Sequence, residues 1–184
     1  MIVENRHAHA YTRGELLEWK DYVLLLRSVI ESKVGGNKSL TVHLLYEIQH
    51  PEVRNVKKGE SYLFYGEALK RSFSIRLYWE NAPWLEHKTW SLRYGNTDWS
   101  YVPRTIDLCL DTGHLMLGCK NRDEFLNLLD MLIKDRGSQI KFLHLHENNF
   151  SSDDHSPVPG KVITRSVMDW LTRDRDFIIE KPWS

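Results

Sequence analysis

Short apolar segments alternate with longer segments of helical periodicity from about residue 40 to the end of the sequence. The apolar segments have the length and composition of β-strands, at positions 40–46, 73–79, 105–110, 140–146 and 177–180. Strands that alternate with helices pack as a parallel sheet covered by helices. The pattern therefore predicts an α/β fold. No repeat or linker divides the chain, so we expect one domain over residues 1–184.

The intervening segments predict helices with recognisable ends. Asn121 followed by Glu124 has the pattern of a capping box, and Gly137 suits the C-terminal exit of the same helix. The sequence predicts helices over residues 16–30, 61–71 and 124–134, and one more short strand over residues 2–9. The aromatic stretch over residues 81–103 is too long for an ordinary connection. It either shapes a site or covers the rim of the sheet.

Four of the predicted strands end in a residue that can bind a metal or move a proton: Glu80, Asp111, His144 and Glu180. The C-terminal ends of parallel strands share one edge of a sheet, so these side chains are expected to converge. Any one of them alone could be a helix cap or an ion-pair partner. As a set, converging carboxylates repel one another unless protons or a cation balance them. The sequence therefore predicts a divalent-metal site for Mn, Mg, Co, Fe or Zn.

A second cluster of candidate ligands follows the His144 strand. Asp153 and His155 form an Asp-x-His pair near enough to supply further metal ligands, although a solvated turn has the same composition. His114 lies three positions after Asp111, and we consider it as a ligand, as a donor to substrate or as a plain rim histidine. His43 and the stretch from His7 to His9 are weaker candidates.

Composition excludes some classes of partner and site. Lys plus Arg number 25, and so do Asp plus Glu, so the net charge of zero offers no field to attract nucleic acid. No apolar run is long enough for a membrane span, and the N-terminus lacks the regions of a signal peptide, so we expect a cytoplasmic protein. Cys109 and Cys119 lack the spacing of a zinc motif and are interpreted as buried thiols rather than a disulfide.

At these motifs the sequence resembles the xylose-isomerase-like TIM barrels, which include sugar-phosphate isomerases and epimerases and the endonuclease IV repair enzymes. The resemblance runs from about Thr41 to Glu180, with the motifs in the family's order. The matching segments are Glu80-Asn81-Ala82-Pro83, Asp111-Thr112-Gly113-His114, His144-Leu145-His146-Glu147-Asn148, Asp154-His155-Ser156-Pro157 and Ile178-Ile179-Glu180. The resemblance implies that Glu80, Asp111, His144 and Glu180 are the family's shared metal ligands.

The sequence also departs from the family pattern. The family barrel has eight strands, whereas this sequence predicts about six, with residues 2–9 in the place of the third. We therefore expect a TIM-type (β/α) barrel that is incomplete, with a homodimer or another chain covering its open edges. Glu147 stands where the family more often has aspartate, and the segment from Gly160 to Val162 lacks the family's glycine-rich acidic turn.

The resemblance implies three alternative functions. The first is a divalent-metal-dependent isomerase or epimerase of sugars or sugar phosphates, in which Glu80 and Glu180 remove and return a proton next to a carbonyl and His114 orients a hydroxyl. The second is a zinc-dependent phosphodiesterase of endonuclease IV type, with a larger ligand set that adds His43, His114, Asp153, His155 and His7 or His9. The third is a non-catalytic remnant that keeps the metal-binding residues.

Overall fold

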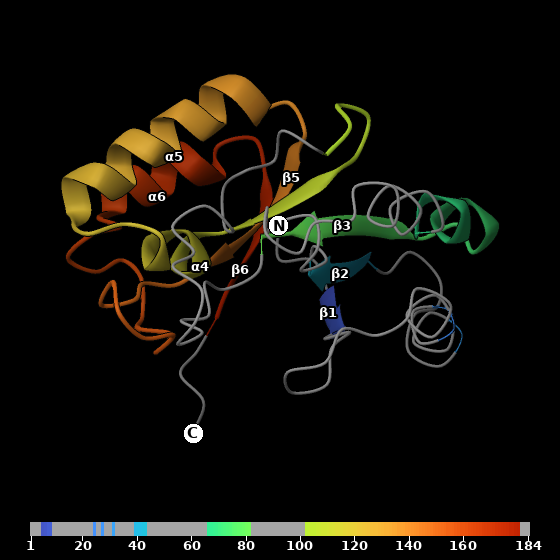
Figure 1. Cartoon of the computed structure of the whole chain (residues 1–184), viewed down its shortest axis with the longest axis horizontal. Coiled ribbons are helices and arrows are strands. Elements are labelled where there is room, and N and C mark those ends of the chain that lie inside the picture. Colours follow the sequence, from blue (N-terminus) through green and yellow to red (C-terminus); the bar gives the residue numbers. More distant parts are fainter. Residues whose placement is uncertain are drawn as a thin grey trace, which may run out of the picture.

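The computed structural model describes residues 5–8, 39–43, 66–81 and 102–180, together with the single residues 24, 27 and 31. Its strands form one sheet in which each strand pairs in parallel with the next one along the chain (Figure 1). They are β1 (Asn5–Ala8), β2 (Ser39–His43), β3 (Arg76–Glu80), β4 (Leu108–Asp111), β5 (Ile140–Leu145) and β6 (Asp176–Ile179).

Sequential parallel pairing is the arrangement of a (β/α) barrel. Within the described ranges β1 and β6 stand at the two ends of the strand order, and no pairing joins them. The predicted α/β class and the incomplete TIM-type barrel are therefore confirmed. The predicted homodimer at the open edges stays a prediction.

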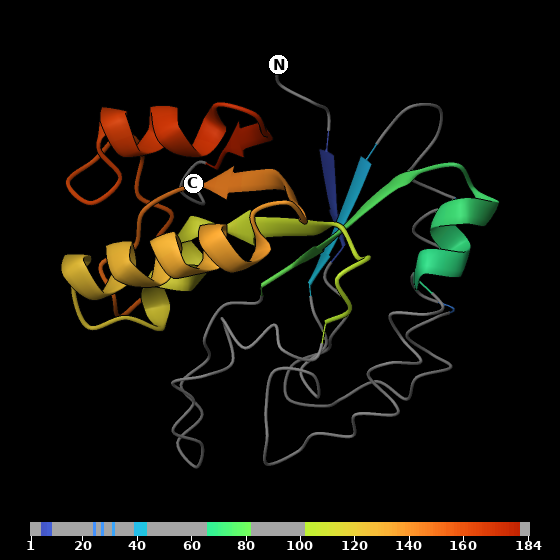
Figure 2. The ribbon, with the colours of Figure 1, turned by 90° about the horizontal axis from the view of Figure 1, so that it is seen from above.

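The helices occupy the connections between strands. α4 (Thr112–Leu117) and α5 (Arg122–Arg136) connect β4 to β5, α6 (Arg165–Thr172) connects β5 to β6, and a further helix at residues 66–72 precedes β3. α5 and α6 lie together on one side of the molecule and the helix at 66–72 on the other (Figure 1, Figure 2). None of the helices described is long and apolar enough to cross a membrane.

The predicted helix over residues 124–134 is confirmed as α5. Asn121 is its N-cap and accepts a hydrogen bond from the Glu124 amide at 3.0 Å, but the Glu124 carboxylate bonds the amide of Lys120 rather than that of Asn121. The helix at 66–72 confirms the end of the predicted segment 61–71, and residues 61–65 lie outside the described ranges. Residues 24 and 27 are helical, as predicted for 16–30. α4 and α6 were not predicted.

The strands agree with the predictions except at their N-terminal ends. β5 and β6 match to within one residue, and residues 44–46 of the predicted second strand lie outside the described part of the chain. β4 begins at Leu108 rather than at residue 105, because the Ile106 amide bonds the Pro103 carbonyl in a turn. The Gln139 side chain donates to the carbonyls of both turn residues at 2.9 Å, which fixes this turn.

β3 begins at Arg76 rather than at residue 73, because the preceding helix ends in a Schellman motif. The Ser74 amide donates to the Arg71 carbonyl at 3.4 Å, and the Ile75 amide donates to the Lys70 carbonyl at 3.2 Å. Ser74 has a φ of 51°, the left-handed conformation that this motif usually gives to glycine.

Replacing Ser74 with glycine is expected to raise the free energy of unfolding by about 0.5–1 kcal/mol. Glycine adopts this φ without a steric cost, and its greater freedom in the unfolded chain offsets only part of the gain. Urea denaturation measures the change. The control is Ser72→Gly in the last turn of the helix, which is expected to lower stability by about 0.5–1 kcal/mol. A Ser74→Gly protein less stable than the wild type would contradict the prediction.

Side chains along the strands alternate between two environments. On the face towards the helices, Leu77 and Trp79 are fully buried in the main core, which includes Phe125 of α5. On the opposite face, a separate inner apolar layer consists of Tyr78, Cys109, Phe142 and Ile178. The rings of Tyr78 and Phe142 stack with centroids 5.4 Å apart. Because the next inward positions along these strands are the predicted ligands, the inner apolar layer forms a floor beneath the candidate site.

Both cysteines are free and buried. Burial raises the pKa of the Cys119 thiol to about 12. Burial and the neighbouring carboxylates, Glu80 first, raise the pKa of Cys109 well above its usual value. Both thiols are therefore protonated at neutral pH, and such thiols are chemically inert.

Candidate metal centre

The four predicted ligands lie together at the C-terminal edge of the sheet. His144 Nδ1 is 3.0 Å from Glu80 Oε1, 3.2 Å from Glu180 Oε1 and 3.8 Å from Asp111 Oδ2. The side chains of Glu80, Asp111 and His144 are buried, and that of Glu180 is 12% exposed. The convergence of strand ends that the sequence predicts is thus what the structure contains.

The register of the sheet places Asp111 and His144 at one level, whereas Glu80 pairs with Cys109, two residues before Asp111. Asp111 of β4 pairs with His144 of β5, and His144 is also the register partner of Ile178 in β6, two residues before Glu180. On the other side, His43 of β2 is the register partner of Glu80. The weaker candidate His7 of β1 pairs with Thr41, lower in the sheet, and His9 lies outside the described residues.

Asn81 holds Asp111 in place where the regular pairing of β3 and β4 has ended. Its Oδ1 accepts from the Asp111 amide at 2.8 Å, and its Nδ2 donates to the Asp111 carbonyl at 3.0 Å. Asp111 is also the N-cap of α4, and its Oδ1 accepts from the His114 amide at 2.7 Å. Asp111 is therefore fixed through both its backbone and its carboxylate. Asn81 belongs to the segment Glu80-Asn81-Ala82-Pro83, but its residue type alone does not predict this role.

His114 lies between the two predicted clusters. Its Nδ1 hydrogen-bonds to the Asn81 carbonyl at 2.9 Å and is 3.6 Å from a carboxylate oxygen of both Glu80 and Asp111, while its Nε2 is 3.6 Å from Asp153 Oδ2. Burial alone lowers the pKa of this ring, but the nearby carboxylates, Asp111 first, outweigh it and raise the pKa to about 10. This raised pKa favours the charged ring, which has two N–H donors.

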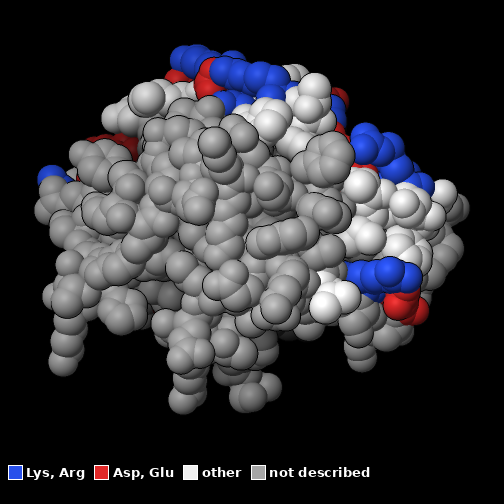
Figure 3. Space-filling view, turned by 45° about the vertical axis from the view of Figure 1, so that its right-hand side comes forward, with Lys and Arg blue, Asp and Glu red and all other residues white. Residues whose placement is uncertain are grey.

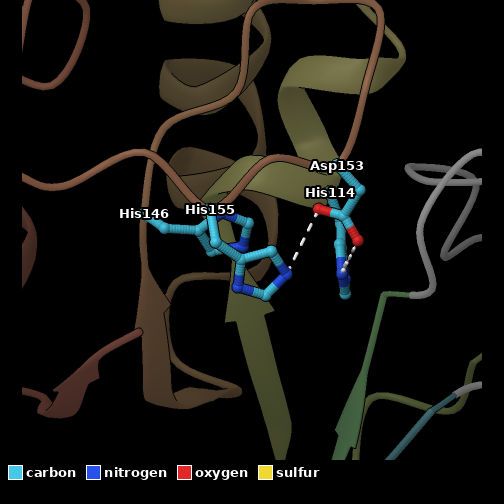
Figure 4. A group of neighbouring side chains, drawn as sticks. All are labelled: His114, His146, Asp153 and His155. Carbon is cyan, nitrogen blue, oxygen red and sulfur yellow. Dashed lines mark ion pairs between the residues drawn. The ribbon is translucent and has the colours of Figure 1, made fainter. Parts of the chain in front are cut away.

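The Asp-x-His pair reaches the same centre. Asp153 Oδ1 is 3.4 Å from His155 Nε2, and His155 Nδ1 is 3.2 Å from Glu180 Oε2. These contacts raise the pKa of His155 to about 10. Burial alone would raise the pKa of Asp153. Its hydrogen bonds with His114 and His155 together have a larger, opposite effect and bring the pKa well below the usual range. The two predicted clusters therefore form one continuous group of imidazoles and carboxylates. Figure 4 shows the part of it that includes Asp153, His155 and His114.

His146 belongs to this group, although sequence reasoning did not select it as a ligand. Its Nε2 is 2.9 Å from Asp111 Oδ1, and its ring stacks on that of His155 with centroids 4.0 Å apart (Figure 4). The side chain is fully buried, and none of the described residues hydrogen-bonds to its Nδ1. The available signal was its position two residues after His144, on the same face of the strand.

The arrangement of these side chains fits a divalent metal. Metal–ligand bonds of roughly 2.0–2.6 Å place neighbouring donor atoms about 3–4 Å apart. The separations of 3.0, 3.2 and 3.8 Å around His144 Nδ1 agree with that spacing. Donor atoms of Asp111, His144 and Glu180 lie within 4.8 Å of one another, and so do those of a second group, His114, His146, Asp153 and His155. Burial raises the energy of such charges unless a cation is shared between them.

Burial also acts on His144, and it would lower the pKa of the ring. The carboxylates of Glu80, Glu180 and Asp111 outweigh this effect, and the pKa of His144 is raised. A raised pKa favours the charged form of the ring beside these carboxylates. Histidine binds metals through a neutral ring nitrogen, so a metal would displace a proton from the ring.

Comparison with known proteins supports a fold assignment. No protein-family model and no curated protein sequence matches the chain. Two solved structures are similar to it. The first is a D-tagatose 3-epimerase-like protein, with a TM-score of 0.63 and 18% identity; the match covers 94% of this chain and 69% of that protein. The second is the apo form of 3-keto-D-glucoside 4-epimerase from E. coli, with a TM-score of 0.58 and 13% identity; the match covers 100% of this chain and 73% of that protein. The chain therefore has the fold of the xylose-isomerase-like TIM barrels.

Proposed function

We propose that this chain is a divalent-metal-dependent isomerase or epimerase of sugars or sugar phosphates that transfers a proton next to a carbonyl. The observation that carries the proposal is the meeting of Glu80 and Glu180 at His144 Nδ1, at 3.0 and 3.2 Å. The two similar structures are both described as epimerases of sugars or as epimerase-like. Their identity to this chain is low, so the reaction itself rests on the geometry of the site.

Epimerisation inverts one carbon, which requires one group to remove a proton and another to supply one on the opposite face. Glu80 is the last residue of β3 and Glu180 directly follows β6, with β4 and β5 between these two strands in the sheet. A carboxylate accepts the proton in its ionised form, and a carboxylic acid returns it. Two carboxylates from different strands around one small volume meet this requirement.

The remaining residues bind and orient. The proposed metal ligands are Glu80, Asp111, His144 and Glu180, with Asp153 and His155 as further candidates. When bound, a divalent ion supplies Lewis-acid stabilisation of the charge that develops on the carbonyl oxygen. His114 keeps its Nδ1 on the Asn81 carbonyl, so its Nε2–H, which faces Asp153, is the group that can orient a substrate hydroxyl.

The first test combines metal content with proton exchange. The purified protein is expected to hold one divalent ion per chain by mass spectrometry and to exchange the proton next to the carbonyl of at least one sugar or sugar phosphate with solvent deuterium. A panel of ketoses and aldoses, free and phosphorylated, followed by NMR in deuterium oxide, identifies the substrate. Metal-loaded protein with no exchange across the panel would contradict the proposal.

The second donor group favours one alternative, a zinc-dependent phosphodiesterase of endonuclease IV type. His114, His146, Asp153 and His155 offer donors within 4.8 Å of one another, in addition to the group around His144. Two or three zinc ions per chain and cleavage of abasic DNA would favour this reading, whereas the zero net charge does not. Protein that binds no metal after reconstitution would point to the non-catalytic remnant.

A further inference from the structure

The loop that carries Asp153 and His155 is closed at its base. The Glu147 amide donates to the Ser156 carbonyl at 2.8 Å, and the Ser156 amide returns a bond of 2.7 Å to the Glu147 carbonyl. The Glu147 carboxylate accepts from the amides of three later residues, Lys161, Val162 and Ile163. The two ends of the loop therefore have fixed positions, and what remains to be explained is how its interior is held.

Asn148 supplies three of the hydrogen bonds inside the loop. Its Oδ1 accepts from the amides of Asp154 and His155 at 3.0 and 3.1 Å, and its Nδ2 donates to Asp153 Oδ1 at 3.0 Å. Asn148 is only 4% exposed, and its own amide bonds the sulfur of Met116 in α4 at 3.3 Å. One side-chain amide thus contacts three consecutive residues of the loop and is itself anchored to the body of the fold.

The backbone of His155 provides an independent observation. Its φ is 50°, in the left-handed region that residues other than glycine rarely adopt. Such a conformation persists only where surrounding contacts hold it, and it is concentrated at functional sites. The amide of His155 is one of the two amides that donate a hydrogen bond to Asn148 Oδ1. Asn148 therefore bonds one of the two described residues of this loop with a left-handed backbone, the other being Phe150 with a φ of 68°.

The contact with Asp153 also decides how its carboxylate is turned. Asn148 Nδ2 donates a hydrogen bond to Asp153 Oδ1, the oxygen that lies 3.4 Å from His155 Nε2. The other oxygen, Oδ2, is left to face His114 Nε2 at 3.6 Å. The loop thereby presents one carboxylate to two imidazoles, as the close-up shows for these three side chains (Figure 4).

We infer that Asn148 is a positioning residue that sets Asp153 and His155 in the orientation in which they complete the candidate centre. The inference rests on the proposed function, because it assigns to Asn148 a role in metal binding through its neighbours. Asn148 itself bonds none of the residues around His144 among the described contacts.

Three variants separate its contacts. Asn148→Ala removes all of them. Asn148→Asp keeps an oxygen for the two amides but replaces the donor with a carboxylate beside Asp153, so only the carboxylate contact is lost. Asn149→Ala is the matched control, because the Asn149 side chain bonds only Ser151 and Ser152 on the exposed part of the loop.

The first readout is the affinity for Mn²⁺, measured by calorimetry on metal-free protein. Asn148→Ala is expected to weaken binding by about 10–100-fold, the usual effect of losing a residue that orients a metal ligand. Asn148→Asp is expected to weaken it as well, because Asp153 is displaced or protonated. Asn149→Ala is expected to stay within about twofold of the wild type.

The second readout needs neither metal nor activity. Diethyl pyrocarbonate modifies exposed histidines, and His155 is 6% exposed in the wild type. In metal-free protein we expect mass spectrometry to find faster modification of His155 in Asn148→Ala, with protection kept in Asn148→Asp and Asn149→Ala. Faster modification in Asn148→Ala combined with a wild type that binds no metal would support the positioning role and count against the proposed function. Equal modification in the wild type and Asn148→Ala overturns the inference whatever the metal content.

Discussion

Glutamine in place of Glu180 is expected to lower the rate of proton exchange between sugar and solvent by roughly 10²–10⁴-fold. Glutamine keeps the size of the side chain but can neither accept a proton from carbon nor return one. It also removes the negative charge 3.2 Å from both His144 Nδ1 and His155 Nδ1, so weaker metal binding is expected as well. Initial rates of deuterium incorporation, measured at saturating metal, separate the loss of proton transfer from the loss of metal.

Glu124→Gln is the matched control, because it makes the same chemical change on an exposed residue in the first turn of α5. It is expected to leave both exchange rate and metal content unchanged. If Glu180→Gln keeps the fold by circular dichroism and exchanges protons at the wild-type rate, Glu180 has no part in proton transfer. The proposal would then have to place both proton-transfer steps on other residues.

Alanine in place of Gly113 is expected to destabilise the protein by about 1–3 kcal/mol. A Cβ at this position would lie 2.0 Å from His146 Cε1, too close for any real contact. The His146 ring cannot turn aside without losing its contact with Asp111 at 2.9 Å and its stacking on His155. Because His146 contacts Asp111, we also expect the affinity for Mn²⁺ to fall by about 10–100-fold.

Urea denaturation and calorimetry measure the two effects of this substitution. Gly118→Ala is the control, because Gly118 ends α4 with φ −83° and ψ −5°, a conformation open to any residue. It is expected to change neither quantity by much. Wild-type stability and wild-type metal affinity in Gly113→Ala would show that the ring of His146 is not held in the position described.

The sequence was sufficient to predict where the strands end and which residues meet there. Glu80, Asp111, His144 and Glu180 each follow an apolar run, and parallel strands bring such positions to one edge whatever the connections between them. Residues facing one side of a strand can likewise be assigned by alternation, and the neighbours Leu77 and Tyr78 do lie in separate apolar clusters. These predictions depend on the local periodicity of apolar residues, which can be read directly from the sequence.

Contacts between side chains and backbone could not be predicted in this way. Asn81 bonds the backbone of Asp111, thirty positions later, and Asn148 bonds amides within a loop of irregular conformation. β3 starts later than predicted because Ser74 has a left-handed backbone, and serine is not a residue type that predicts this conformation. Each of these features is set by tertiary packing or by a specific backbone angle, and residue type alone does not encode them.

The described residues of the centre all come from the consecutive strands β3 to β6 or from the segments that directly follow them, which include α4 and the loop after β5. Strands β1 and β2 lie beside this run in the strand order, so that β2 is the strand next to β3. Substitutions in β1 and β2 during evolution would leave the donor set of the centre in place. The part of the barrel that surrounds the centre and the part that carries its donor atoms can therefore diverge separately in a barrel built this way.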